Sequence, residues 1–414
     1  MQLNTRVSRS LTLAASVGLS LTLAAGCASD TGGSPQPETG TTATAPKEQA
    51  SATPRLAVSY DGGVLILDAT TLDTVDETEI EGFTRLNPAG NGRHVIISSG
   101  EAFKVLDTGT WSSTHDDHTH YYTTDPAMTD VEFAANEPGH VVRHAGKTVL
   151  FNDGSGLVEI FDPIHLAKRQ PRVETYTTPE PHHGVAVALA DGNLLTTIGN
   201  SESRNGIALL DGDRKEILRN EQCPGVHGEA VAAGETIVLG CQDGLLVYKD
   251  DAITKVQSPD PYGRIGNQAG SEESEIVLGD YKSDPTAELE RPQRISLTNT
   301  WTSELKLVDL GTSYTFRSLG RGPHGEALVL GTDGAIHVID PHSGAVINKI
   351  AVIDEWTEPT DWQEPRPALF VSDHTAYVTD PASKKLIAVD LEDGTIAGET
   401  TLDHTPNELT GVTG

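Results

Sequence analysis

The feature that most constrains the fold is a series of short apolar segments that recur along the chain. Segments such as "VLILDA", "HVIISS", "LLVYKD" and "AIHVID" are rich in β-branched residues and are separated by turn sequences such as Asp-Gly and Asn-Gly. No segment carries the sustained 3.6-residue apolar stripe of an amphipathic helix. The sequence therefore predicts an all-β protein built from hairpins.

Three longer stretches resemble one another: "HHGVAVALADGNLLTT", "VHGEAVAAGETIVLG" and "PHGEALVLGTDGAIHVID". In register, each puts a histidine followed by a glycine at one shared position. The histidines at this position are His183, His227 and His324, and the same register puts Thr129, Gly266, Arg366 and Asn407 at its further copies. Most copies are about 40–55 residues apart, the length of a four-stranded propeller blade.

This spacing predicts a β-propeller of eight four-stranded blades. The stretch "HTPNELTGV" near the C-terminus has the inner-strand pattern without further strands of its own. We therefore expect this C-terminal strand to complete the first blade and close the ring. Seven blades is the alternative, because the copy at "GNQAG" is the faintest.

The N-terminal region predicts export. Arg6 and Arg9 precede an apolar run, residues 11–25, that is too short to span a bilayer, so residues 1–26 are expected to be a signal peptide. It ends in "LAAGC", which resembles a bacterial lipobox and makes Cys27 the expected lipidation site. Residues 27–54 contain few groups able to pack and are expected to be a disordered tether, followed by the propeller domain at 55–414. The expected location is extracytoplasmic, lipid-anchored to the outer face of the bacterial cell membrane, or periplasmic.

Charge and cysteine content narrow the class of partner. A formal net charge of −31 argues against nucleic acid, because phosphate binding needs the opposite sign. The membrane is expected to be contacted only through the lipid anchor, and the protein is expected to be a monomer. Cys223 and Cys241 are predicted to form a disulfide, because the run between them is typical of a hairpin that turns at Gly234-Glu235.

The repeated histidines predict a metal site. The first residue of every inner strand lies at one mouth of a propeller channel, so we expect His183, His227 and His324 to meet there. Three imidazoles with a carboxylate or water satisfy tetrahedral Zn²⁺, whereas Ca²⁺ and Mg²⁺ prefer oxygen shells. Copper(II) would bind such a site more tightly, so zinc is inferred from geometry and availability. Binding is expected to weaken as protons compete for imidazoles with the ordinary pKa of about 6.5.

A second histidine source is the stretch "HDDHTHYY". Its metal-ligand candidates are His115, Asp116, Asp117, His118 and His120. The stretch lies just before the copy at Thr129, so it is expected to converge on the same channel mouth as a flexible arm that captures and transfers zinc. Additional ligands or supporting residues are expected among His182, Glu229 and Glu326. The remaining histidines are interpreted as surface or packing residues: His94, His140, His144, His165, His337, His342, His374 and His404.

Together, the export signal, "HDDHTH" and the "HHGVAV", "CPGVHGEA" and "GPHGEA" strands resemble the AztD family of extracytoplasmic zinc chaperones. The resemblance covers most of the chain from about residue 56. It implies a β-propeller that holds zinc and passes it to the solute-binding protein of a zinc ABC importer. It also implies metal ligands among His183, His227 and His324 and a metal-capturing segment at residues 115–120.

Two other classes of function remain open. A metal-dependent propeller enzyme, such as a lyase or lactonase, would use zinc to activate water. The sequence contains no convincing nucleophile–base pair and no cofactor motif, so we expect a protein that is not an enzyme. A propeller that binds a protein or glycan without metal is the other alternative.

Overall fold

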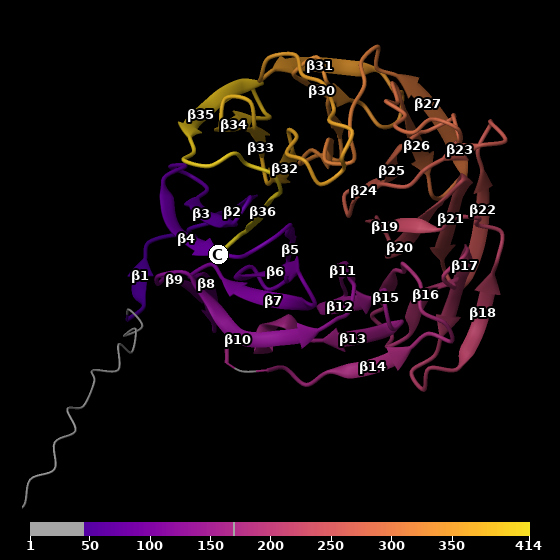
Figure 1. The fold of residues 1–414 in the computed structure, drawn as a ribbon, viewed down its shortest axis with the longest axis horizontal. Helices are drawn as coiled ribbons and strands as arrows, with labels where there is room; N and C mark the ends of the chain where they lie inside the picture. Colours follow the sequence, from indigo (N-terminus) through magenta and orange to yellow (C-terminus); the bar gives the residue numbers. More distant parts are fainter. Residues whose placement is uncertain (1–44, 169) are drawn as a thin grey trace, which may run out of the picture. The chain divides into compact units, whose positions relative to one another are not determined.

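The computed structural model describes residues 45–168 and 170–414 (Figure 1). The predicted signal peptide, Cys27 and the tether as far as residue 44 lie outside these ranges. Within them, the regular secondary structure is all β-strand except for one short 3₁₀ helix at Pro163–His165. None of the helical structure in the described ranges is long and apolar enough to cross a membrane.

Eight sheets, each with a path of four antiparallel strands, follow one another around a ring (Figure 1). From the centre outward, the first four are β36 (Leu409–Val412), β2 (Arg55–Tyr60), β3 (Gly63–Asp68) and β4 (Thr74–Glu79); β5 (Arg85–Pro88), β6 (His94–Ser99), β7 (Ala102–Asp107) and β10 (Ala127–Ala134); β11 (Pro138–His144), β12 (Lys147–Asn152), β13 (Leu157–Phe161) and β14 (Glu174–Thr177); β15 (Ala186–Ala188), β16 (Leu194–Gly199), β17 (Arg204–Leu210) and β18 (Glu216–Asn220).

The remaining sheets have the same layout. From the centre outward they are β19 (His227–Ala232), β20 (Thr236–Cys241), β21 (Asp243–Lys249) and β22 (Ala252–Gln257); β24 (Gln268–Ser271), β25 (Ser274–Asp280), β26 (Arg294–Asn299) and β27 (Glu304–Asp309); β28 (Leu319–Arg321), β29 (Ala327–Leu330), β30 (Ala335–Ile339) and β31 (Val346–Ala351); β32 (Leu369–Ser372), β33 (Thr375–Asp380), β34 (Lys385–Asp390) and β35 (Thr395–Thr401). The short strand β23 (Gly263–Arg264) pairs in parallel with β21. A separate three-stranded sheet contains β1 (Lys47–Gln49), β9 (His118–Thr123) and β8 (Thr110–His115).

The β-propeller prediction is confirmed. Neighbouring inner strands contact one another around the ring, including β19 with β24, β24 with β28, and β28 with β32. The blade number stays a prediction, which the eight sheets favour over seven. β36 pairs with β2 from Arg55 opposite Val412 to Val58 opposite Leu409, so the C-terminal strand completes the sheet that the first propeller strands begin.

The predicted strand register is correct at some copies and wrong at two. Gly266, Arg366 and Asn407 lie just before inner strands, as expected. Thr129 lies instead in β10, the outermost strand of its sheet. His324 lies in the turn after the inner strand β28, so the apolar run that follows it forms the second strand, β29. The His-Gly motif is thus shared by two different places in a blade, which the alignment of short apolar runs did not separate.

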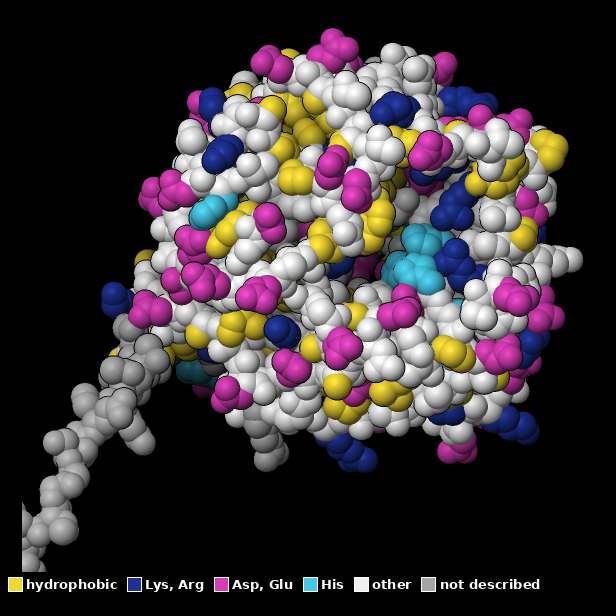
Figure 2. Space-filling view, in the orientation of Figure 1, with side chains coloured by type: hydrophobic (Ala, Val, Ile, Leu, Met, Phe, Trp, Pro, Cys, Tyr) yellow, Lys and Arg dark blue, Asp and Glu magenta, His cyan; other side chains and the backbone are white. Residues whose placement is uncertain are grey.

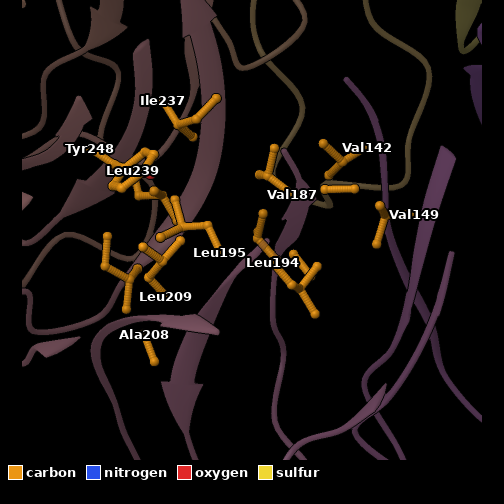
Figure 3. Packing of buried hydrophobic residues seen from close by; sticks show 14 of the residues in the cluster. Val142, Val149, Val187, Leu194, Leu195, Ala208, Leu209, Ile237, Leu239 and Tyr248 are labelled. Carbon is orange, nitrogen blue, oxygen red and sulfur yellow. The ribbon is translucent and has the colours of Figure 1, made fainter. Parts of the chain in front are cut away.

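The third, fourth and fifth sheets share one hydrophobic core (Figure 3). Val142 from the third sheet, Val187 and Leu209 from the fourth, and Leu239 from the fifth are all almost fully buried. Burying an aliphatic side chain of this size stabilises a fold by about 1.5–3 kcal/mol relative to exposing it. This shared core therefore holds the inner strands β11, β15 and β19 at fixed positions relative to one another.

Strand structure is present before residue 55. Residues 47–49 form β1, which pairs with β9 so that Glu48 lies opposite Tyr122. The end of the predicted tether is therefore a strand, because the edge of β9 offers its backbone as a pairing partner.

Candidate metal centres

Three histidines meet at one end of three consecutive inner strands. His140 belongs to β11, His183 precedes β15, and His227 is the first residue of β19. Each can offer a nitrogen within 4.8 Å of those of the other two. The ring centroids are 5.1 Å apart for His140 and His183, 5.3 Å for His140 and His227, and 5.0 Å for His183 and His227. We call these residues the central group, and Figure 2 shows histidine side chains gathered beside the hollow at the centre of the ring.

Irregular strand pairing directs two of these side chains. The register shifts between Pro138 and Val141 in β11 and between His227 and Glu229 in β19. Such bulges bend a strand and re-aim its side chains, and they are common beside functional sites. Gly228 sits in the second bulge at a φ of +70°, a conformation that L-residues rarely adopt.

Each ring of the central group has a neighbour at its Nδ1 atom. His183 Nδ1 lies 2.5 Å from Asp153 Oδ2, and His227 Nδ1 lies 2.7 Å from the carbonyl oxygen of Gly266. A carbonyl oxygen only accepts, so His227 donates its Nδ1–H and keeps the lone pair on Nε2. Metal-binding histidines commonly use the second nitrogen in this way, because the outer hydrogen bond fixes the tautomer and the ring orientation.

The third ring has a carboxyl neighbour. His140 Nδ1 lies 3.5 Å from Glu229 Oε2. Burial raises the pKa of Glu229 to about 8. Glu229 thus lies beside His140 of the central group, although the sequence had associated it with His227.

Two rings of the central group, His140 and His227, are kept in the neutral form that binds metal. Burial, reinforced by the neighbouring His183, lowers the pKa of His140 to about 3. Burial and the neighbouring His140 lower the pKa of His227 well below its ordinary value. The ordinary imidazole pKa of about 6.5 assumed for the predicted ligands is therefore wrong for His227. Protons compete for His140 and His227 only at lower pH, because burial disfavours the charged imidazolium.

His140 is the ligand candidate that the sequence analysis missed. It lies 43 residues before His183, and His183 lies 44 residues before His227. This regular spacing falls within the repeat length, and "EPGHVV" carries a Pro-Gly-His similar to "CPGVHG". The signal was hidden because Thr129 had been taken as the start of that blade.

His324 does not join His183 and His227. It lies after β28, whereas the central group lies where inner strands begin, so it is at the other end of the inner strand. Its neighbours are His374 and Glu392, with which it forms a separate group of potential ligands. Glu326 accepts a hydrogen bond from the backbone N–H of His324 at 3.0 Å and thus holds the turn.

His182 is a packing residue and not a supporting residue of the metal group. Its Nδ1 lies 3.0 Å from the carbonyl oxygen of Glu180, and its Nε2 lies 3.0 Å from the hydroxyl oxygen of Thr197. Its ring packs edge-on against Phe151. Both nitrogens are therefore engaged within the protein.

The "HDDHTH" stretch forms an antiparallel hairpin and not a flexible loop. It is inserted between β7 and β10, the third and outermost strands of the second sheet. His115 pairs with His118 across β8 and β9. Trp111 stacks on Tyr122 with ring centroids 5.5 Å apart, and the Arg93 guanidinium lies 4.0 Å above the Trp111 ring. These contacts order the hairpin, whose tip is polar. The sequence did not indicate this order, because the tip lacks the apolar alternation of a strand.

Three histidines share one face of this hairpin. The ring centroids of His115, His118 and His120 lie 4.4–4.9 Å apart, and each ring can offer a nitrogen within 4.8 Å of the others. His120 Nδ1 lies 2.6 Å from Glu48 Oε1 in β1. We call these three histidines the hairpin group. Asp116 and Asp117 lie at the exposed turn beside it.

The hairpin group and the central group are separate. Figure 1 places β8 and β9 at the outside of the ring, away from β11, β15 and β19. The expectation that the two histidine sources converge at one mouth is therefore wrong. The expectation failed because the hairpin is inserted next to β10, the outermost strand of the second sheet.

A disulfide braces the strand that carries His227. Cys223 and Cys241 are bonded, with their Cα atoms 4.9 Å apart. The hairpin between them turns at Gly234 and Glu235, both at positive φ, as the sequence indicated. The bond therefore joins the segment before β19 to the end of β20.

These observations define a class: an all-β propeller with histidine groups suited to a borderline-soft divalent metal. No protein-family model matches the chain. It is 26% identical over 364 residues to a protein named zinc chaperone AztD from Citrobacter koseri, covering 85% of this chain and 84% of that protein. The resemblance to the AztD family that the motifs suggested is confirmed.

Solved structures agree with this comparison. The crystal structure of Citrobacter koseri AztD matches with a TM-score of 0.77 at 25% identity, covering 88% of this chain and 99% of that chain. The structure of apo AztD from Citrobacter koseri matches with a TM-score of 0.76 at 25% identity, covering 87% and 98%. The dihydro-heme d1 dehydrogenase NirN matches with a TM-score of 0.57 at 12% identity, covering 86% and 74%, which shows the fold alone.

Proposed function

We propose that this protein is a zinc metallochaperone that holds Zn²⁺ at the central group and passes it to the solute-binding protein of a zinc ABC importer. The observation that carries the proposal is the triangle of His140, His183 and His227 with a neighbour at each Nδ1 atom. The similarity to a protein named zinc chaperone supports the choice of metal and role. That relative is a chaperone by name, in agreement with the expectation of a protein that is not an enzyme.

Three imidazoles suit zinc that must be released again. They fill three tetrahedral positions at about 2.0–2.1 Å and leave the fourth for water or for a ligand from a partner. The side chain of His183 is 43% exposed, so an incoming protein can approach the metal from that side. Zinc can then change hosts one ligand at a time without becoming a free ion.

The hairpin group is proposed as a second, more exchangeable zinc site. Its three imidazoles are between 30% and 56% exposed, and the two turn aspartates are almost fully exposed. An exposed site gains less from a shielded environment, so its ion exchanges more readily. This role keeps the predicted capture and transfer of zinc but assigns it to an ordered hairpin.

The proposed location is the extracytoplasmic side of a bacterial membrane. A signal peptide at 1–26 and lipidation of Cys27 would leave the propeller on a tether, as a monomer, at the outer face of the cell membrane or in the periplasm. Acidic side chains are dispersed over the face in Figure 2, and the net charge is −31. This charge attracts cations.

Direct transfer tests the proposal. The zinc-loaded protein is mixed with the metal-free solute-binding protein of a zinc ABC importer in the presence of excess chelator. The acceptor is expected to receive zinc at a rate that increases with its own concentration. The variant His342→Ala is expected to transfer zinc at the same rate. His342 is exposed and lies outside the three groups of potential metal ligands.

Two results would count against the proposal. A transfer rate fixed at the spontaneous dissociation rate contradicts direct handover. Absence of stoichiometric zinc from the protein, measured by elemental analysis after metal titration, favours a propeller that binds a protein or glycan without metal.

A further inference from the structure

The geometry points to an additional divalent-metal site formed by His324, His374 and Glu392 on the face of the propeller opposite the central group. We call these residues the turn group. The site takes a borderline divalent ion such as Zn²⁺, Co²⁺ or Ni²⁺, and it does not depend on the proposed chaperone function.

The position follows from strand order. His324 lies in the turn between β28 and β29, and His374 lies in the turn between β32 and β33. Glu392 lies in the turn between β34 and β35. In an antiparallel four-stranded blade, the turn after the first strand and the turn after the third lie at the same end. The central group lies at the opposite end, where inner strands begin.

The three donors already converge. Glu392 Oε1 lies 3.2 Å from His324 Nε2 and 2.6 Å from His374 Nδ1. One carboxylate oxygen therefore faces one nitrogen of each ring, and all three donor atoms lie within 4.8 Å of one another. A metal ion would bind the lone pairs of these ring nitrogens, with each ring proton moved to the other nitrogen of its ring, and small side-chain rotations would bring all three donors to the ion.

Local hydrogen bonds hold the turns that carry these donors. Glu326 accepts the backbone N–H of His324, and the adjacent Gly325 has a φ of +85°. The backbone N–H of Glu392 donates to Asp390 Oδ1 at 2.8 Å. Donors on fixed turns lose little conformational freedom on binding, which favours a preformed site.

The choice of metal follows from the donors and from their exposure. Two imidazoles and one carboxylate suit zinc, cobalt and nickel, whereas magnesium and calcium prefer oxygen ligands. A hollow of about 150 Å³ lies beside His324 and Glu392, with room for water molecules on the metal. The three side chains are 54–65% exposed, so the bound ion is hydrated and exchanges readily.

Residue-resolved protection tests the site in the mature protein. Zinc is added, histidines are modified with diethyl pyrocarbonate, and modified peptides are quantified by mass spectrometry. His324 and His374 are expected to become protected together at one zinc concentration. His342, which is 65% exposed in the neighbouring β30–β31 turn, is expected to stay reactive.

Stoichiometry supplies the second readout. Equilibrium dialysis is expected to give one fewer bound zinc in His374→Ala and in Glu392→Gln, with the tight site retained, and no change in His342→Ala. Loss of a zinc equivalent in both variants supports the turn group. Unchanged stoichiometry and no protection of His324 would overturn it and leave a hydrogen-bonded surface cluster. Variants of the central group test the chaperone proposal separately, because they leave these three residues intact.

Discussion

Removing the C-terminal strand is expected to collapse the whole propeller. Deleting residues 407–414 removes β36, the inner strand of the first sheet. The deletion exposes the edge of β2, whose backbone is paired at Ser59 with Asn407 and Glu408 at 2.7 and 2.9 Å. It also removes the carboxylate of Glu408, which lies 2.8 Å from Nη2 of buried Arg317.

The magnitude follows from these lost contacts. Leaving a buried cation such as Arg317 without its partner costs about 3–5 kcal/mol. Loss of buried Val412 and partly buried Leu409 costs roughly 1.5–3 kcal/mol each. Each lost backbone hydrogen bond adds about 0.5–1.5 kcal/mol. The combined loss is about 8 kcal/mol or more, comparable with the whole stability of a typical domain, about 5–15 kcal/mol.

Chemical denaturation followed by tryptophan fluorescence measures this effect. The truncated protein is expected to lose most of its free energy of unfolding, and Glu408→Gln is expected to lose about 3 kcal/mol through its ion pairs with Arg317 and Arg85. Glu399→Gln is the matched control, because its exposed ion pair with Lys385 contributes at most about 1 kcal/mol. A truncated protein with an unchanged denaturation midpoint would refute ring closure by β36.

Three further predictions concern stability, pH and the hairpin. Replacing Cys223 and Cys241 by serine is expected to lower the free energy of unfolding by about 3 kcal/mol, measured by denaturant titration, since the bond closes a loop with a sequence separation of 18. Burial lowers the pKa of His94 to about 4, so the native state binds fewer protons than the unfolded chain between the two pKa values, and stability is lost as pH falls from about 6.5 towards 4. In His94→Gln, the loss of unfolding free energy between about pH 7.5 and about pH 4.5 is expected to be smaller by about 2–3 kcal/mol; an unchanged loss contradicts the lowered pKa of His94. Alanine at all three positions of the hairpin group is expected to remove one zinc equivalent in dialysis and to slow loading while the tight affinity persists; unchanged stoichiometry and rate would make the cluster a solvated surface.

Periodicity was enough to predict the class of fold. Short β-branched runs between Gly-containing turns repeat at the length of a blade, and that repeat predicted the propeller, the closing strand β36 and the hairpin between Cys223 and Cys241. Such features depend on local turn chemistry and on strand alternation, which the sequence carries directly.

The composition of the central group could not be predicted in the same way. A His-Gly pair satisfies a turn at either end of an inner strand, so His324 looked equivalent to His227 although it faces the other end of the blade. His140 was overlooked because the hairpin insertion displaced the apparent start of its blade. The hairpin itself was misplaced because its order depends on Trp111 and on pairing with β1, which are tertiary contacts.

The zinc affinity of two single variants tests the central claim most directly. Competition with a chromophoric chelator at neutral pH is expected to show that His140→Ala weakens the tight site by at least about 100-fold, because it removes one of three ligands. His324→Ala is expected to retain the tight affinity. Retained tight binding in His140→Ala together with its loss in His324→Ala would contradict the assignment of the central group.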